Sequence, residues 1–250
     1  MRSGTFVLTT ALVALAAGTA GAQTETALTP TQIAIACAPK PSFDGAPDSA
    51  LHVIGGQDTT PKTEFGTRDL LVVDGGTKAG VQIGQQFFVR RVSRYAPPGH
   101  ARGRTATTEG WIRIVAVNES TAIATVERTC AAISAGNFLE PFVAPVVPGE
   151  TDRDDRAGEP DFTSLSRVVI ADEGHTSAAP GDFVLIDHGG EEGFTAGARF
   201  AIYRDIGVKG MPLASVGDGV VIATGNKVAV TRITRARDAV ISGDYVVIRK

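Results

Sequence analysis

Apolar residues in this chain are grouped in short runs, separated by turns rich in Gly, Asp and Asn. Beyond the N-terminal region, no run keeps the period of about 3.6 residues that marks an amphipathic helix. Runs of Val, Ile, Thr and Phe between such turns predict β-strands, because Gly readily adopts the positive φ that tight turns require. We therefore expect an all-β protein with little helix. The predicted strands span residues 51–54, 69–73, 86–92, 110–117, 121–126, 133–139, 167–170, 182–186, 198–204, 219–224, 227–233 and 240–247.

The same pattern occurs twice. In each copy an apolar strand ends at an aspartate, a glycine follows six residues later, a second glycine four residues after that, and a Phe three residues further on. The shared spacing is informative because a slip of one residue would turn every side chain of a strand to the opposite face. We interpret the shared aspartates and glycines as structural turn residues: Asp74, Gly80 and Gly84 in the first copy, and Asp187, Gly193 and Gly197 in the second.

The duplication predicts two tandem small β-barrel modules, SH3-like or similar, at residues 51–143 and 166–250. Residues 1–22 have the features of a secretory signal peptide, and their apolar stretch is too short for a membrane span. Residues 23–50, rich in Pro, Thr and Ala, are expected to be extended. Residues 144–165 are charged and are expected to form a solvated linker. The mature chain should lie in the periplasm or outside the cell, without a transmembrane span.

Cysteine content and net charge indicate which functions and compartments suit this chain. Cys37 and Cys130 are the two cysteines, and in an exported chain they predict one structural disulfide. A redox-active pair would normally show C-x-x-C spacing, which is absent here. The formal net charge of −3 argues against nucleic-acid binding, because domains that bind nucleic acids are typically basic.

The order of strands, turn glycines and Gly-Asp pairs resembles a known repeat. The residues that carry it best are Pro180-Gly181-Asp182-Phe183, Asp187, Gly193, Gly197, Phe200, Arg204 and Ser242-Gly243-Asp244-Tyr245. The first copy has Arg68-Asp69 where Gly-Asp is expected and Asn137 where Asp is expected. The pattern resembles the small β-barrel repeat that accompanies lysin-motif proteins of Gram-negative envelopes, and is similar to the C-terminal domain of flagellar assembly protein T. The resemblance implies an envelope-associated, non-catalytic module that packs against other proteins.

Residues that could perform chemistry have simpler structural explanations. Asp187 and His188 could orient an imidazole for a serine nucleophile such as Ser177, Ser215 or Ser242. However, Asp187 belongs to the repeated turn, and its counterpart Asp74 is followed by Gly75. The four histidines are scattered, whereas zinc ligands are usually closely spaced. We therefore expect no catalytic residue, no metal site and no cofactor.

A basic loop between the third and fourth predicted strands of the first copy departs from the repeat. It is four residues longer than its counterpart, measured from Arg91 to Gly110 against Arg204 to Gly219. Clustered guanidinium groups in an acidic protein predict a docking site for phospholipid headgroups, acidic glycan or a partner protein. The alternative is a solvated hairpin tip. The candidate binding residues are Arg90, Arg91, Arg94, Tyr95, His100, Arg102 and Arg104.

These observations favour an exported, non-enzymatic scaffold or interaction protein of the cell envelope that binds an envelope protein. The alternative function is a module that binds peptidoglycan or another carbohydrate of the cell wall. Such a module needs a concave surface lined by aromatic side chains, and the chain has one Trp and three Tyr.

Overall fold

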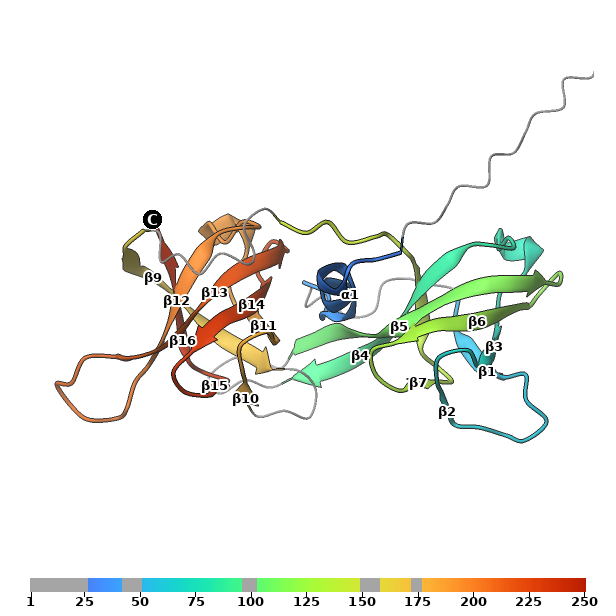
Figure 1. Cartoon of the computed structure of the whole chain (residues 1–250), viewed down its shortest axis with the longest axis horizontal. Helices are drawn as coiled ribbons and strands as arrows, with labels where there is room; N and C mark the ends of the chain where they lie inside the picture. Colours follow the sequence, from blue (N-terminus) through green and yellow to red (C-terminus); the bar gives the residue numbers. More distant parts are fainter. Residues whose placement is uncertain (1–26, 42–50, 96–102, 149–157, 172–176) are drawn as a thin grey trace, which may run out of the picture.

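The computed structural model describes residues 27–41, 51–95, 103–148, 158–171 and 177–250 (Figure 1). The predicted signal peptide, residues 1–22, lies outside them. Within the described residues strands dominate, and the α-helical content is a single segment of 8 residues. The expectation of an all-β protein is therefore confirmed.

Helix α1 (Pro30–Cys37) lies in the segment that was expected to be extended. Its start is encoded locally. The Thr29 side chain accepts a hydrogen bond from the Gln32 amide at 3.2 Å, and Oε1 of Gln32 accepts one from the Thr29 amide at 3.0 Å. This reciprocal pair is a capping box, and Pro30 fits the first helical turn because its missing N–H would have had no partner there. The expectation of an extended segment is wrong for these residues.

Strands from the first predicted module form one antiparallel sheet, here called the first sheet. Its order is β1-β3-β6-β5-β4-β8. The two edges of the sheet approach each other: the Val53 amide donates to the Asn137 carbonyl at 2.9 Å, and the Gly136 amide donates to the Val53 carbonyl at 2.7 Å. The strands are β1 (Val53–Gly56), β3 (Leu70–Val73), β4 (Gln86–Tyr95), β5 (Gly103–Val117), β6 (Ala122–Thr129) and β8 (Phe138–Pro141).

Strands from the second predicted module form a closed antiparallel barrel of order β11-β14-β13-β12-β16-β9. A two-stranded ribbon of β10 (Ser177–Ala178) and β15 (Val240–Ile241) accompanies it, as β2 (Glu64–Phe65) and β7 (Ile133–Ser134) accompany the first sheet. The barrel strands are β9 (Pro160–Ala171), β11 (Phe183–Ile186), β12 (Arg199–Arg204), β13 (Ala214–Thr224), β14 (Ala229–Ala236) and β16 (Tyr245–Arg249).

The two halves have the same strand order. If β9 is matched to β1, the barrel sequence β9-β11-β14-β13-β12-β16 corresponds strand by strand to β1-β3-β6-β5-β4-β8. A short 3-10 helix follows the equivalent strand in each half, η1 (Thr77–Ala79) and η2 (Gly190–Glu192). The repetition seen in the sequence therefore extends to how the strands pair.

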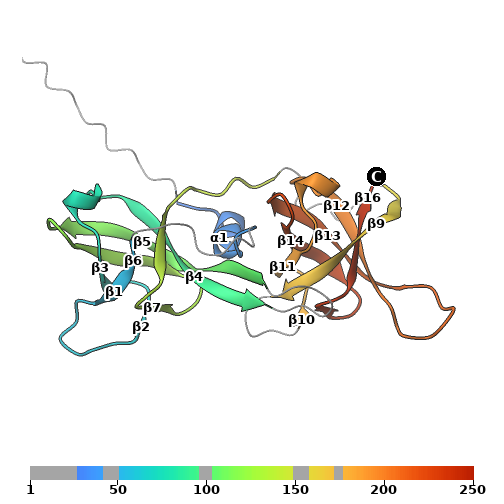
Figure 2. The ribbon, with the colours of Figure 1, turned by 180° about the vertical axis from the view of Figure 1, so that it is seen from behind.

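Each half has its own apolar core, built from the inward-facing residues of its strands. Leu71, Ile112 and Ile114 are among the fully buried residues of the first sheet, and Phe194 and Phe200 are among those of the barrel. In Figures 1 and 2 the first sheet and the barrel lie next to each other along the long axis of the molecule, with α1 between them.

Several strands are longer than predicted. β4 continues to Tyr95, and β5 begins at Gly103. The two strands therefore form a long hairpin where a loop was expected. β9 begins at Pro160, inside the segment expected to be linker. The pairing of Val89 with Gly110 and of Ile202 with Gly217 also shows that Gly217, not Gly219, is the counterpart of Gly110.

Candidate functional site

The predicted basic surface begins at Arg90, which the structure places inside the protein. Its side chain donates to Glu140 at 3.1 Å, bonds to the Thr108 hydroxyl and stacks on the ring of Phe88 at 4.5 Å. Burial lowers the pKa of Arg90 and the Glu140 carboxylate partly offsets this effect. Because Arg90 is 8% exposed, it supports the sheet instead of forming part of a docking surface.

Arg91 is more exposed and is paired with Glu109, whose carboxylate lies 3.1 Å from its Nε. The backbones of Arg94, Tyr95 and Arg104 belong to the β4–β5 hairpin, in which Arg94 is opposite Arg104. Their side chains, and His100 and Arg102 entirely, lie outside the part of the chain that the structure describes. A basic docking site at this hairpin therefore remains a prediction.

Asp74 and Asp187 occupy equivalent positions and make equivalent bonds. The Asp74 carboxylate accepts the amide of His52, and that of Asp187 accepts the amide of Arg167 at 2.6 Å. Each aspartate thus fastens the end of its strand to a neighbouring segment about twenty residues earlier. The four turn glycines have left-handed φ values of 78°, 86°, 89° and 88° at Gly80, Gly84, Gly193 and Gly197.

The Asp187 carboxylate lies within hydrogen-bond distance of the His188 imidazole, 3.0 Å from its Nδ1. Ser166 also contacts this pair, through a hydroxyl that donates to the Asp187 carboxylate at 2.9 Å. Ser242, one of the three serines considered above, donates to the Val169 carbonyl at 3.0 Å. Among the described residues, His188 has its hydrogen bond with Asp187, and no group of His, Cys, Asp and Glu has the arrangement of a metal site.

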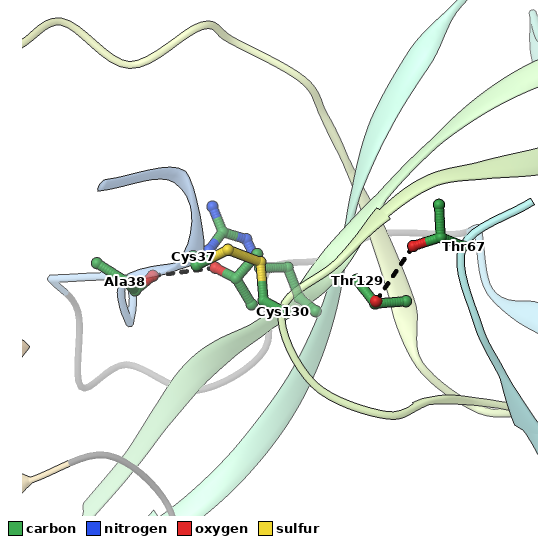
Figure 3. The surroundings of a disulfide bond; sticks show 7 residues. Cys37, Ala38, Thr67, Thr129 and Cys130 are labelled. Carbon is green, nitrogen blue, oxygen red and sulfur yellow. Dashed lines mark hydrogen bonds between the residues drawn. A yellow bond between two sulfur atoms is a disulfide. The ribbon is translucent and has the colours of Figure 1, made fainter. Parts of the chain in front are cut away.

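The Cys37–Cys130 disulfide is present, with Cα atoms 5.5 Å apart and a sequence separation of 93 (Figure 3). It joins the C-terminus of α1 to the end of the β5–β6 pair. Close to it, the Thr108 hydroxyl donates to the Ala38 carbonyl at 3.0 Å, and the Lys40 amide donates to the Ala106 carbonyl at 2.9 Å. Residues 30–41, here called the brace, are therefore held against the first sheet.

The brace also contacts the barrel. Ala38 packs with Leu185 and Val230, which lie on the outside of the barrel and are nevertheless almost completely buried. The Pro41 carbonyl lies so close to Gly225 that a Cβ there would come within 2.2 Å of the oxygen. The same short segment thus covers outward-facing apolar residues of both halves.

A pocket of about 630 Å³ opens between the N-terminal part of α1, the outer face of β5 and β6, and the chain just after β8. We call it the outer pocket. Its aromatic wall is formed by Trp111 and Phe142, whose ring centroids are 5.7 Å apart. Phe88 extends the cluster at 4.6 Å from Phe142. The lining residues are Ala27, Leu28, Ile33, Gln86, Trp111, Arg113, Glu127, Arg128, Phe142 and Ala144.

The polar rim of the outer pocket carries excess positive charge. Glu127 accepts a hydrogen bond from Gln86 at 2.6 Å and forms an ion pair with Arg113. Arg128 is exposed and makes no ion pair within the described part of the chain. The lining therefore contains two guanidinium groups and one carboxylate, and the apolar wall lies beside a cation, Arg128, that is available to a ligand.

Sequence reasoning did not identify this pocket. One local signal was present: Thr29-Pro30-Thr31-Gln32 is a capping-box sequence followed by apolar residues, which predicts a helix start. The position of α1 over Trp111, however, depends on contacts between segments far apart in the chain. No comparable signal marks Arg113, Glu127 or Arg128 as neighbours of that helix.

No family model matches this chain, and a search of curated proteins finds no relative. Within the described residues, none of the helices is long and apolar enough to cross a membrane.

Proposed function

We propose that this protein is an exported, non-enzymatic interaction protein of the cell envelope, built from two related β modules of a small-barrel, SH3-like type. The observation that carries the proposal is the outer pocket, an aromatic-walled concavity with a cationic rim on the outside of a braced pair of β units. The shared strand order supports the two-module interpretation. The disulfide is compatible with an oxidising compartment outside the cytoplasm.

The partner proposed for the outer pocket is a protein segment that carries an apolar side chain beside a carboxylate. The apolar group would pack on Phe142, beside Trp111, and the carboxylate would bind Arg128. Concave, largely preformed pockets with a few convergent polar groups are typical binding sites.

A glycan is the alternative ligand, favoured by the presence of the single tryptophan in the pocket wall. Trp111 is only 6% exposed, and Phe88 only 7%. Neither ring therefore offers a broad open face on which a sugar could stack. This burial favours the protein segment over the glycan.

The test uses the mature protein as bait for detergent-extracted envelope proteins and, separately, for isolated cell-wall sacculi. Arg128→Ala should weaken capture of a protein partner about five- to tenfold, because it removes a charge-assisted contact. Arg237→Ala, which removes an exposed arginine from the other half, is the matched control and should leave capture unchanged. Retention on sacculi, unaffected by protein extract, would support the glycan alternative and contradict the proposal.

Trp111 provides a second readout because it is the only tryptophan in the chain. Binding in the outer pocket should change its emission, because the surroundings of the ring change. A captured partner that leaves Trp111 emission unchanged would bind elsewhere, and the assignment of the outer pocket would be wrong.

A further inference from the structure

The loop between β12 and β13, residues 205–213, presents apolar side chains to solvent. Ile206 is 50% exposed, Val208 is 55% exposed and Met211 is 58% exposed. We call this segment the apolar tip. Figures 1 and 2 show it running out beyond the strands of the barrel, at the end of the molecule away from the first sheet.

The backbone of the apolar tip is organised and does not collapse onto the barrel. The Met211 amide donates to the Val208 carbonyl at 3.1 Å, which closes a turn, and the Gly207 amide donates to the Asp205 carboxylate at 2.8 Å. Gly207 and Gly210 have left-handed φ values of 74° and 85°. These bonds hold the tip in a shape that keeps its large apolar side chains in water.

The apolar tip carries one lysine, and the carboxylates near it lie at its base. Lys209 is exposed between Val208 and Met211. The carboxylates at the base are engaged: Asp205 accepts the Gly207 amide, and Asp238 pairs with Arg204 at 3.0 Å. Lys209 is therefore a cation among apolar neighbours, and the Asp205 carboxylate lies at the start of the loop.

This combination favours a lipid surface over a folded partner. The tip is convex, so a rigid partner would need a groove shaped to receive it, whereas a bilayer deforms around an inserted side chain. Apolar side chains partition into the boundary between headgroups and acyl chains, and a neighbouring lysine is attracted to anionic headgroups. Clustered exposed apolar residues mark interaction sites more often than single ones do.

We propose that the apolar tip docks on the surface of a phospholipid bilayer, with Ile206, Val208 and Met211 entering the interface and Lys209 contacting anionic headgroups. This contact is separate from the outer pocket and does not depend on the function proposed for it. Three side chains give a weak, reversible attachment and not a permanent anchor.

The test is co-sedimentation of the full-length mature protein with sucrose-loaded vesicles of phosphatidylcholine, with and without an equal part of phosphatidylglycerol. The wild-type protein should pellet with the vesicles, more strongly when phosphatidylglycerol is present. The double variant Ile206→Ser, Val208→Ser should lower the partition coefficient at least fivefold. Lys209→Ala should remove the preference for vesicles that contain phosphatidylglycerol. Its binding to vesicles of pure phosphatidylcholine should equal that of the wild-type protein.

The matched control is Ile83→Ser combined with Val146→Ser, which removes two equally apolar side chains that are 70% and 83% exposed outside the tip. The proposal is overturned if wild-type protein stays in the supernatant with both vesicle types, or if the control reduces binding as much as the tip variant. It is also overturned if the tip variant changes only self-association in sedimentation velocity, because a second copy would then cover the tip. Circular dichroism melting of each variant checks that the barrel remains folded.

Discussion

The carbonyl oxygen of Ala38 accepts a 3.0 Å hydrogen bond from the buried hydroxyl of Thr108, 70 residues away in the chain. The methyl group of Ala38 packs at the same time on Leu185 and Val230 of the barrel. One small residue thus contacts both halves of the molecule. Ala38 is only 7% exposed, so any side-chain volume added at this position enters the contact between the two halves.

Ala38→Leu should therefore destabilise the protein and loosen the contact between its halves. Overpacking a buried site costs about 1–3 kcal/mol. Chemical denaturation measures this loss, and small-angle X-ray scattering should show an increased radius of gyration. Ala144→Leu, on the exposed chain after β8, is the control and should leave both quantities unchanged. Equal stability of Ala38→Leu and wild type would show that the brace does not press on the barrel.

Cys130→Ala removes the bond that fastens the brace to the first sheet. In the chain-entropy model, a closed loop of this length contributes about 4–5 kcal/mol, because the crosslink restricts the unfolded chain. The variant should melt at a lower temperature than wild type under oxidising conditions. In reductant the two proteins should melt together. A drop of the same size in both conditions would mean that the effect comes from packing and not from the disulfide.

Two equivalent positions, one in each half, share a left-handed backbone conformation but have different residues. Arg68 has a left-handed φ of 76°, and the equivalent position in the barrel is Gly181, with φ 98°. A Cβ at Gly181 would meet no atom within 4 Å, so a substitution there tests backbone conformation alone. Gly181→Arg should cost about 1–2 kcal/mol, because L-residues are strained in this region.

The reciprocal change, Arg68→Gly, should be neutral or stabilising by up to about 1 kcal/mol, since the relief of strain is partly offset by the greater entropy of the unfolded glycine. Urea denaturation of both variants measures the two effects. If Gly181→Arg were neutral and Arg68→Gly destabilising, the contacts of the arginine side chain would outweigh the backbone conformation.

Asp218 on β13 should make stability depend on acidic pH. Burial raises the pKa of Asp218, but hydrogen bonds from Arg249 at 2.8 Å and Arg235 at 3.0 Å outweigh it and hold the pKa below its ordinary value of 3.8. A carboxylate whose pKa is depressed on folding stabilises the protein above the unfolded value, and this stabilisation is lost as the pH falls through the folded value.

Asp218→Asn should accordingly lower the free energy of unfolding by about 1–2 kcal/mol at pH 7, because charge-assisted hydrogen bonds are lost. The difference from wild type should shrink as the pH falls below 3.8. Urea denaturation at a series of pH values measures it. Asp205→Asn, an exposed control, should change stability by no more than about 0.5 kcal/mol. A difference between Asp218→Asn and wild type that stays constant across the acidic range would contradict this account of Asp218.

The turns show how far local sequence specifies this fold. Asp182 caps its turn through the Ala179 amide at 2.8 Å, and Asp69 and Asn137 make the same bond to Gly66 and Ser134. These contacts span three residues, so side-chain chemistry alone determines them. The departure of Asn137 from the expected Asp preserves the acceptor oxygen, which explains why the turn survives it.

The sequence by itself determined the strand content and the repetition, because turn glycines and apolar runs follow from local chemistry, and it determined the disulfide, because the chain has two cysteines. Tertiary structure alone decided the position of α1, the burial of Arg90 and the grouping of Trp111 with Arg128. These features depend on side chains from distant segments meeting at a surface outside the two cores. The alternation of apolar and polar residues predicts which side chains of a strand share a face. It does not predict which distant segment covers the outward-facing side of the sheet.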